Sequence, residues 1–233
     1  VVLGALLEKT GASGVLMDIA VSMTRNSRGG PAKAAVVGSS LMGMISGTAV
    51  ANVLTTGTIS IPLMRRGGYR PAVAGAVEAV ASTGGQLMPP IMGAAAFLMA
   101  DIMEVPYLDI TKAALLPALL FYIAVFASVH LEAIKTGLKP LESIDIPDVA
   151  QSLRNSGHVL LSIPVFIGTL ISGYSVMYSS LAGIICLLAL SLLRHSSRLN
   201  PRQLIAAAVS AAEAILPVAL ATATAGIIIG VVT

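Results

Sequence analysis

The chain has 233 residues, of which 56% are hydrophobic and 11% charged, with a formal net charge of +3 and a mean hydropathy of +0.90. Charged residues make up about a quarter of a soluble domain, so the composition excludes a soluble protein and indicates an integral membrane protein with no nucleic-acid partner. The apolar runs are blocks of Leu, Ala, Ile and Val rather than alternating patterns, which predicts membrane-spanning helices and not a β-barrel.

Residues 1–24 are predicted to be the end of one span followed by a helix that lies along the membrane surface. The segment GVLMDIAVSMT, residues 14–24, has apolar residues at helical spacing, with Asp18 and Ser22 on the other side. The first residues, VVLGALLEKTG, have neither a starting Met nor a basic signal region, and the last, AGIIIGVVT, stop inside an apolar run. We therefore expect the sequence to be a fragment of a longer polypeptide.

Residues 31–66 are predicted to form a re-entrant helical hairpin. Basic segments at 25–33 and 65–70 flank 31 uncharged residues, 34–64, and cytoplasmic connectors are the ones rich in Lys and Arg. Two full crossings need roughly 40 residues, whereas two half-helices of about 15 residues each reach about 22 Å into a hydrocarbon core about 30 Å thick. The polar stretch from Ser46 to Thr56 then lies at the tip of the hairpin and along its second arm.

Residues 70–104 are predicted to be a span broken in its middle by STGGQLMPP, residues 82–90. Two glycines followed by two prolines do not continue a regular helix, and Pro89 and Pro90 are expected to begin the second half-helix. Glu78 is the one formally charged residue in the apolar part of this span. An intramembrane carboxylate is a candidate functional group, and a structural role and a coupling role both stay open for it.

The remaining segments complete a multi-span helical bundle. A span is predicted at 111–131, a cytoplasmic linker at 132–156, two spans at 157–193 that turn at SGYS (172–175), and an interfacial helix with the start of a second repeat at 203–233. This topology places 13 of the 14 basic residues on the cytoplasmic side, with Lys112 as the exception.

The two helix breaks together predict the site of a secondary transporter. Helices that end near the bilayer midplane direct carbonyl groups there, and helices that begin there present free N–H groups. Carbonyl, hydroxyl and amide oxygens suit a monovalent cation, while helix N-termini suit an anionic substrate. Ser46 between glycines raises the alternative of an intramembrane hydrolase, but the G-x-S-x-G spacing and a mid-membrane histidine are lacking. The single Cys186 and the three scattered histidines predict no transition-metal site.

Residues 38–101 resemble the large membrane subunit of the tripartite ATP-independent periplasmic (TRAP) transporters, and in particular the TAXI branch, whose small and large membrane subunits are usually fused. The matching motifs are the hairpin GMISGTAVAN, the segment IPLMRRGGY and the break ASTGGQLMPP. The resemblance implies the first half of an inverted-repeat, elevator-type transporter in the bacterial inner membrane. It also implies a sodium-coupled importer of small, dicarboxylate-like or amino-acid-like organic anions, which is not an enzyme and has no cofactor besides the co-transported Na⁺.

The resemblance further implies partners and site residues. The partners are a periplasmic TAXI-type substrate-binding protein, the small membrane subunit and the lipid bilayer. Many family members have Asp where this chain has Asn52, so the site carries one less negative charge. The alternatives are another inverted-repeat, ion-coupled anion transporter, an intramembrane hydrolase or a passive channel. Glu78 is the candidate coupling residue, and the candidate sodium- and substrate-binding residues are Ser46, Gly47, Thr48, Asn52, Thr56, Thr83, Gly84, Gly85, Gln86, Pro89 and Pro90.

Overall fold

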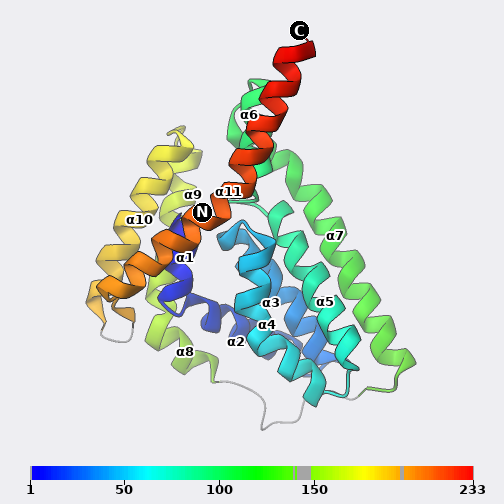
Figure 1. Cartoon of the computed structure of the whole chain (residues 1–233). Helices are drawn as coiled ribbons and strands as arrows, with labels where there is room; N and C mark the ends of the chain where they lie inside the picture. Colours follow the sequence, from blue (N-terminus) through cyan, green and yellow to red (C-terminus); the bar gives the residue numbers. More distant parts are fainter. Residues whose placement is uncertain (1, 139, 141–147, 195–196, 233) are drawn as a thin grey trace.

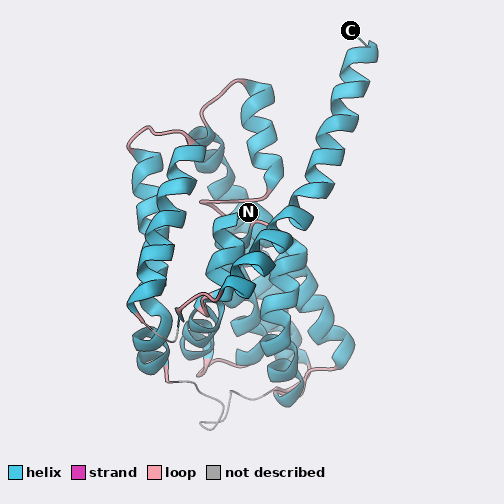
Figure 2. Ribbon diagram, turned by 60° about the vertical axis from the view of Figure 1, so that its left-hand side comes forward, coloured by secondary structure: helices cyan, strands magenta, loops and turns pink. Residues whose placement is uncertain are grey.

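The structure is a computed structural model that describes residues 2–138, 140, 148–194 and 197–232, and the regular elements in these ranges are all helices (Figures 1 and 2). This confirms the prediction of an all-helical chain. The elements in chain order are α1 (Val2–Lys9), α2 (Ala12–Thr24), α3 (Gly30–Ser46), α4 (Ala49–Arg66), α5 (Pro71–Gly84), η1 (Gly85–Leu87), α6 (Ala94–Met103), α7 (Tyr107–Lys135), α8 (Val149–Ser156), η3 (Gly157–Leu161), α9 (Ser162–Ile171), α10 (Val176–Leu193) and α11 (Pro201–Val232).

Helices α3 and α4 form a helical hairpin with arms of 17 and 18 residues. The first arm has Pro31 at its start, where the missing N–H of proline costs nothing. It ends at Gly47, which has a left-handed backbone (φ 67°) and donates its N–H to the carbonyl of Gly43, as a glycine after a helix commonly does. Thr48 is extended, and α4 begins at the next residue. The depth of this hairpin in the membrane stays a prediction.

The segment that follows consists of two helices, α5 and α6, separated by the turn η1 and an irregular stretch, residues 88–93. The sequence prediction for Pro89 and Pro90 is wrong, because α6 begins at Ala94 and both prolines lie in the irregular stretch. The carbonyls of Pro90 and Ile91 accept hydrogen bonds from the hydroxyl of Tyr107 on α7, at 3.2 and 2.5 Å. These carbonyls are therefore held by a side chain instead of by a helical ladder.

Two helices in the described ranges, α7 and α10, are long and apolar enough to cross a membrane by length and composition. The span predicted at 111–131 lies inside α7, which has 29 residues. The region predicted as two spans at 157–193 contains η3 and α9, then α10, with a turn at residues 172–175 between them. Of the predicted linker at 132–156, residues 139 and 141–147 lie outside the described residues.

The two pieces predicted in 203–233 are one continuous helix in the described residues, α11, which runs from Pro201 to Val232. The sequence from Ala206 to Leu216 contains neither Gly nor Pro and is rich in Ala, the best helix former. An interruption between an interfacial helix and a following helix therefore has no local cause before Pro217, and α11 continues through that proline as well. In Figure 1 the helix crosses in front of α1 and continues past the rest of the molecule toward the C-terminus.

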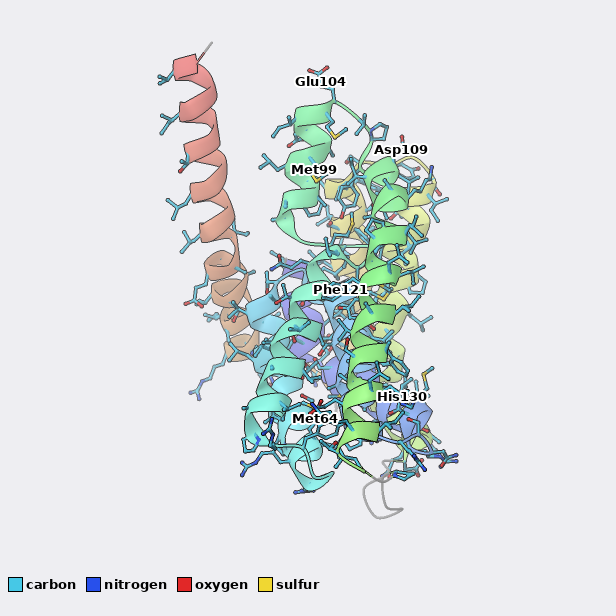
Figure 3. All side chains as sticks on the ribbon, turned by 90° about the vertical axis from the view of Figure 1, so that its right-hand side faces the viewer. Met64, Met99, Glu104, Asp109, Phe121 and His130 are labelled. Atoms are coloured by element: carbon cyan, nitrogen blue, oxygen red, sulfur yellow. The ribbon has the colours of Figure 1, made fainter. Side chains whose placement is uncertain are left out.

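Charged connectors lie at the two ends of the molecule. Glu104 and Asp109 are at one end, and Met64 and His130 are at the other, with Phe121 between them (Figure 3). Lys33 departs from this pattern, because it is buried in the first turn of α3 rather than in a connector. Its Nζ lies 5.2 Å from the ring centroid of Phe126 on α7, in a cation–π contact.

Candidate functional site

The tip of the hairpin packs directly against the break between α5 and α6. A Cβ atom added to Gly43 would lie 2.2 Å from the Cα of Gly85, and one added to Gly47 would lie 2.6 Å from the carbonyl oxygen of Met92. Both distances are far below van der Waals contact, so the two backbones approach as closely as only glycine permits. The structure thus places the two breaks in the chain beside each other.

Asn52, one turn into α4, ties the hairpin to α5. Its side chain is fully buried, and its Nδ2 donates to the carbonyl of Ser39 on α3 at 2.9 Å and lies 3.5 Å from the carbonyl of Ser82 on α5. The Oδ1 atom lies 3.4 Å from the hydroxyl oxygen of Thr56. A buried amide needs several partners, and here they come from three helices.

Glu78 on α5 lies fully buried on the same side of the hairpin, and its carboxylate accepts hydrogen bonds from four hydroxyl groups. Oε1 accepts from Ser39 at 3.2 Å, from Thr56 at 2.5 Å and from Ser82 at 2.9 Å, while Oε2 accepts from Ser60. An ionised carboxylate has about four lone-pair sites. The four hydroxyls therefore satisfy it without a positively charged partner. We call these five residues the Glu78 cluster.

The register of α4 explains why its polar side chains reach this cluster. Asn52, Thr56 and Ser60 follow one another at intervals of four residues and are all buried, so they lie on one face of the helix. Thr55 and Thr58 lie off this face, and their hydroxyls donate to the carbonyls of Ala51 and Thr55 at 2.8 and 2.9 Å. The polar residues of the hairpin thus divide into an inward row and ordinary back-bonded hydroxyls.

The other candidate residues from the sequence lie at the tip and at the break, in different environments. Ser46 is buried and its hydroxyl donates to the carbonyl of Thr48 at 3.4 Å, which keeps this serine at the tip. Gly84 packs against Phe121 on α7: a Cβ there would lie 2.1 Å from a ring carbon. Pro90 is buried in the irregular stretch beside Tyr107, with Pro89 half-buried before it.

Thr83 and Gln86 have exposed side chains, so the structure does not bring these two side chains into the buried constellation. The Thr83 hydroxyl donates to the carbonyl of Ala79 at 2.7 Å. Successive helical residues are about 100° apart, so Thr83 points away when Ser82 points toward Glu78. The backbone of Gln86 nevertheless shapes the break, because its carbonyl accepts from the N–H of Gly93 at 2.7 Å.

Sequence reasoning did not place Ser39, Ser60 and Ser82 in the site, although their hydroxyls all contact Glu78. Two signals were available in the sequence. Ser82 lies four residues after Glu78, and Ser60 continues the four-residue spacing of Asn52 and Thr56. Ser39 lies 39 residues from Glu78 and carries no comparable local signal.

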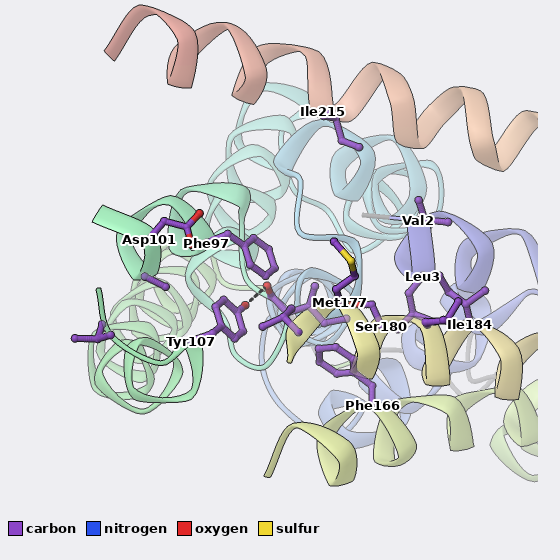
Figure 4. Close-up of a pocket in the computed structure, with 15 residues that line it drawn as sticks. Val2, Leu3, Phe97, Asp101, Tyr107, Phe166, Met177, Ser180, Ile184 and Ile215 are labelled. Atoms are coloured by element: carbon purple, nitrogen blue, oxygen red, sulfur yellow. Dashed lines mark hydrogen bonds between the residues drawn. The ribbon is translucent and has the colours of Figure 1, made fainter. Parts of the chain in front are cut away.

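A separate cleft of about 870 Å³ lies beside the break, between α1, α6, α9, α10 and α11 (Figure 4). Most of its lining is apolar, and the rings of Phe97 and Tyr107 stack at its edge with their centroids 4.6 Å apart. Asp101 and Ser180 are among its few polar groups. The cleft offers few polar partners to an ion, so the hairpin tip and the Glu78 cluster, with their buried polar groups, are the candidate site.

Comparison with known proteins supplies the family. The family model described as "Tripartite ATP-independent periplasmic transporter, DctM component" matches residues 1–233. The chain belongs to the DctM family of TRAP transporters. Membership in the DctM family confirms the resemblance seen in the hairpin and the break. DctM proteins are membrane permeases of the bacterial inner membrane, and the composition and the apolar helices α7 and α10 agree with that.

The alignments with individual relatives cover part of this DctM-family chain and a smaller part of each relative. It is 29% identical over 170 residues to the C4-dicarboxylate TRAP transporter large permease protein DctM of Pseudomonas aeruginosa, covering 73% of this chain and 39% of that protein. It is 32% identical over 105 residues to the uncharacterized protein y4mL of Sinorhizobium fredii, covering 45% of this chain and 25% of that protein. It is 27% identical over 173 residues to the uncharacterized protein YgiK of Salmonella typhimurium, covering 74% of this chain and 40% of that protein. The chain thus spans two fifths or less of the relatives it matches.

Proposed function

We propose that this chain is part of a sodium-coupled secondary transporter of the TAXI type that imports small organic anions. The observation that carries this proposal is the direct contact between two helix breaks, at Gly43–Gly85 and at Gly47–Met92. Interrupted helices that meet inside a membrane protein are the usual way to bind an ion and a substrate together. The P. aeruginosa relative is a C4-dicarboxylate permease by name, which supports a dicarboxylate or a similar anion as the substrate.

The dipoles of the helix ends support this pairing of charges. Helices α3 and α5 end at the contact and direct their last carbonyls toward it, whereas α4 begins there and α6 begins a few residues beyond. Helix C-terminal ends favour cations and helix N-terminal ends favour anions, each by about 0.3–1 kcal/mol and more when buried. We assign Na⁺ to the oxygens of Ser46, Gly47, Thr48 and Asn52, and the anion to the N–H groups at the starts of α4 and α6.

We further propose two protein partners for the complete transporter. A periplasmic substrate-binding protein of the TAXI type delivers the anion, and a small membrane subunit is fused to the same polypeptide. Membership in the DctM family supports both partners in general terms. In this arrangement the Glu104 end of the molecule faces the periplasm, where a binding protein docks.

Uptake of a labelled anion into liposomes tests the proposal. The full-length polypeptide is reconstituted, the binding protein is added outside, and an inward Na⁺ gradient is imposed. We expect uptake to require both the gradient and the binding protein. Replacement of Na⁺ by choline at equal ionic strength, and omission of the binding protein, are the two controls. Uptake that persists unchanged in either control refutes the mechanism.

A further inference from the structure

We infer that the Glu78 cluster is itself a monovalent-cation site, with Glu78 as its negatively charged ligand. The cluster lies about two helical turns from the hairpin tip, on the side of the connectors. The inference rests on the cation coupling proposed above and deepens it, because it names a charged ligand that the residues at the tip lack. It concerns Ser39, Thr56, Ser60 and Ser82 together with Glu78.

The cluster brings many oxygen atoms to one buried point. The two carboxylate oxygens of Glu78 are surrounded by the four hydroxyl oxygens, and the Oδ1 of Asn52 lies 3.4 Å from the Thr56 hydroxyl oxygen. These groups come from α3, α4 and α5, and all of their side chains are at most 2% exposed. Carboxylate, hydroxyl and amide oxygens are the ligands that hard cations prefer.

When its carboxylate is ionised, the cluster carries a net negative charge that calls for a counter-ion. Within the described residues, no Lys, Arg or His nitrogen forms an ion pair with Glu78. Lys33 on the adjacent helix α3 places its Nζ over the ring of Phe126. Hydroxyl groups satisfy the hydrogen bonds of a carboxylate but leave its net charge in place. A buried net charge is costly unless an opposite charge accompanies it, and a cation taken from solution supplies that charge.

The hydroxyl groups can turn from the carboxylate to a cation without a change of fold. Thr56 has one proton, and its two nearest acceptors are Oε1 of Glu78 at 2.5 Å and the backbone carbonyl of Asn52 at 2.7 Å. When the proton points to the Asn52 carbonyl, a lone pair of the Thr56 oxygen faces the cluster. A small rotation thus converts a hydrogen-bond donor into a cation ligand.

Cation binding is measured as Na⁺-dependent stabilisation of the full-length protein in detergent, with choline replacing Na⁺ at constant ionic strength. At a Na⁺ concentration 100 times Kd, a ligand that binds only the folded state shifts the folded-to-unfolded ratio about 100-fold. We expect at least this shift in the unchanged protein and expect Glu78→Gln, which keeps the shape and removes the charge, to reduce it to the part contributed by Na⁺ at the hairpin tip. Ser60→Ala should weaken the apparent affinity for Na⁺ at least several-fold. Thr58→Ala, which removes an exposed hydroxyl from the same helix, is the matched control and should leave the affinity unchanged.

Two results overturn the inference. One is a Glu78→Gln protein that Na⁺ stabilises as strongly as the unchanged protein, and the other is a Ser60→Ala protein with the same Na⁺ affinity as Thr58→Ala. If Glu78→Gln does not fold, Glu78→Asp takes its place in a radioactive ²²Na⁺ binding assay, where undiminished affinity counts against the site. The outcome is independent of the transport proposal, because binding is measured without substrate, gradient or binding protein. Sodium-driven uptake with an unaffected Glu78→Gln protein would refute the cation site alone.

Discussion

Asn52 shows how one residue serves both packing and chemistry. Its amide nitrogen reaches carbonyl groups on α3 and α5, and its oxygen faces the Thr56 hydroxyl. A buried acceptor left without its donor costs about 1–3 kcal/mol. The same amide lies next to the glycine contact, since a Cβ on Gly85 would be 3.0 Å from its Nδ2. A side chain of another shape or polarity at position 52 therefore disturbs the tip and the cluster together.

Replacement of this amide by a hydrocarbon of similar size tests its role in transport. We expect Asn52→Leu to abolish uptake and to lower the free energy of unfolding by about 1–3 kcal/mol, because the carbonyls of Ser39 and Ser82 lose the amide donor that links them and the Thr56 hydroxyl loses the amide oxygen. Size-exclusion chromatography and thermal unfolding report on folding, and the liposome assay reports on uptake. Thr58→Leu, at an exposed position of the same helix, is the control. Normal uptake by a folded Asn52→Leu protein contradicts the assignment.

At the scale of elements, glycines decide how closely the hairpin approaches the broken helix. Gly43 on α3 and Gly85 in η1 meet with no room for a Cβ on either side. Gly75 on α5 is different, because a Cβ added there meets no atom within 4 Å. The two positions provide a matched pair, in which the same one-carbon change meets backbone at one position and open space at the other.

Replacement of glycine by alanine is predicted to have different effects at Gly43 and at Gly75. Gly43→Ala should lower the free energy of unfolding by about 1–3 kcal/mol, because the new methyl group forces the hairpin away from the break. Gly75→Ala should be neutral or stabilising by up to about 1 kcal/mol, because Ala is the better helix former. Chemical or thermal unfolding of both variants provides the comparison, together with liposome uptake, which we expect Gly43→Ala alone to lose. Equal stability and uptake in the two variants would show that the close contact has no role.

Much of the element structure could be predicted from local sequence, and the failures have a common cause. The chain reversal near Gly47 and the break after Gly84 follow from charge spacing and from Gly and Pro content, which are local properties. The start of α6 does not, because the hydroxyl of Tyr107 holds carbonyls 16 and 17 residues away. Such a contact exists only after the helices have packed.

The candidate site was predictable to a similar degree. The four-residue spacing of Asn52, Thr56 and Ser60 indicates a common face. It does not show that Glu78, on another helix, lies opposite that face. The family resemblance includes Thr83 and Gln86 among the site residues. Their side chains are exposed, however, and only the backbone of this stretch borders the hairpin. Side-chain direction depends on the exact end of α5, which the sequence alone does not define.

At the scale of the whole molecule, the basic connectors of the hairpin lie at one end and the acidic connector with Glu104 lies at the other. The Tyr69 hydroxyl, in the connector after α4, lies 3.4 Å from the carbonyl of Gly29 in the connector before α3. The basic residues of both connectors are therefore at the same end, and Glu104 is at the other end (Figure 3). The excess of Lys and Arg favours the cytoplasm for the end with both hairpin connectors.

Cysteine labelling makes this topology directly testable. In a background with Cys186 and every other cysteine of the full-length polypeptide replaced by Ser, Arg28→Cys places a thiol in the connector before the hairpin and Arg65→Cys places one at the end of α4. Glu104→Cys places one at the opposite end. We expect a membrane-impermeant maleimide to label Glu104→Cys from the periplasmic side of intact cells. The other two variants should react only in inverted vesicles. Labelling of Arg28→Cys and Arg65→Cys from opposite sides would contradict the hairpin, because both a re-entrant pair of arms and two complete crossings return the chain to the side from which it entered.

The hydroxyl groups around Glu78 also have a mechanical consequence. Two of the donors lie on α4, one on α3 and one on α5 itself, so the carboxylate bonds across all three helices at once. Any displacement of α3 or α4 from α5 would strip a buried carboxylate of donors, at a cost of about 1–3 kcal/mol or more for each group left unsatisfied. We therefore expect α3, α4 and α5 to move together as one block. A large movement of the protein would then take place around this block and not through it.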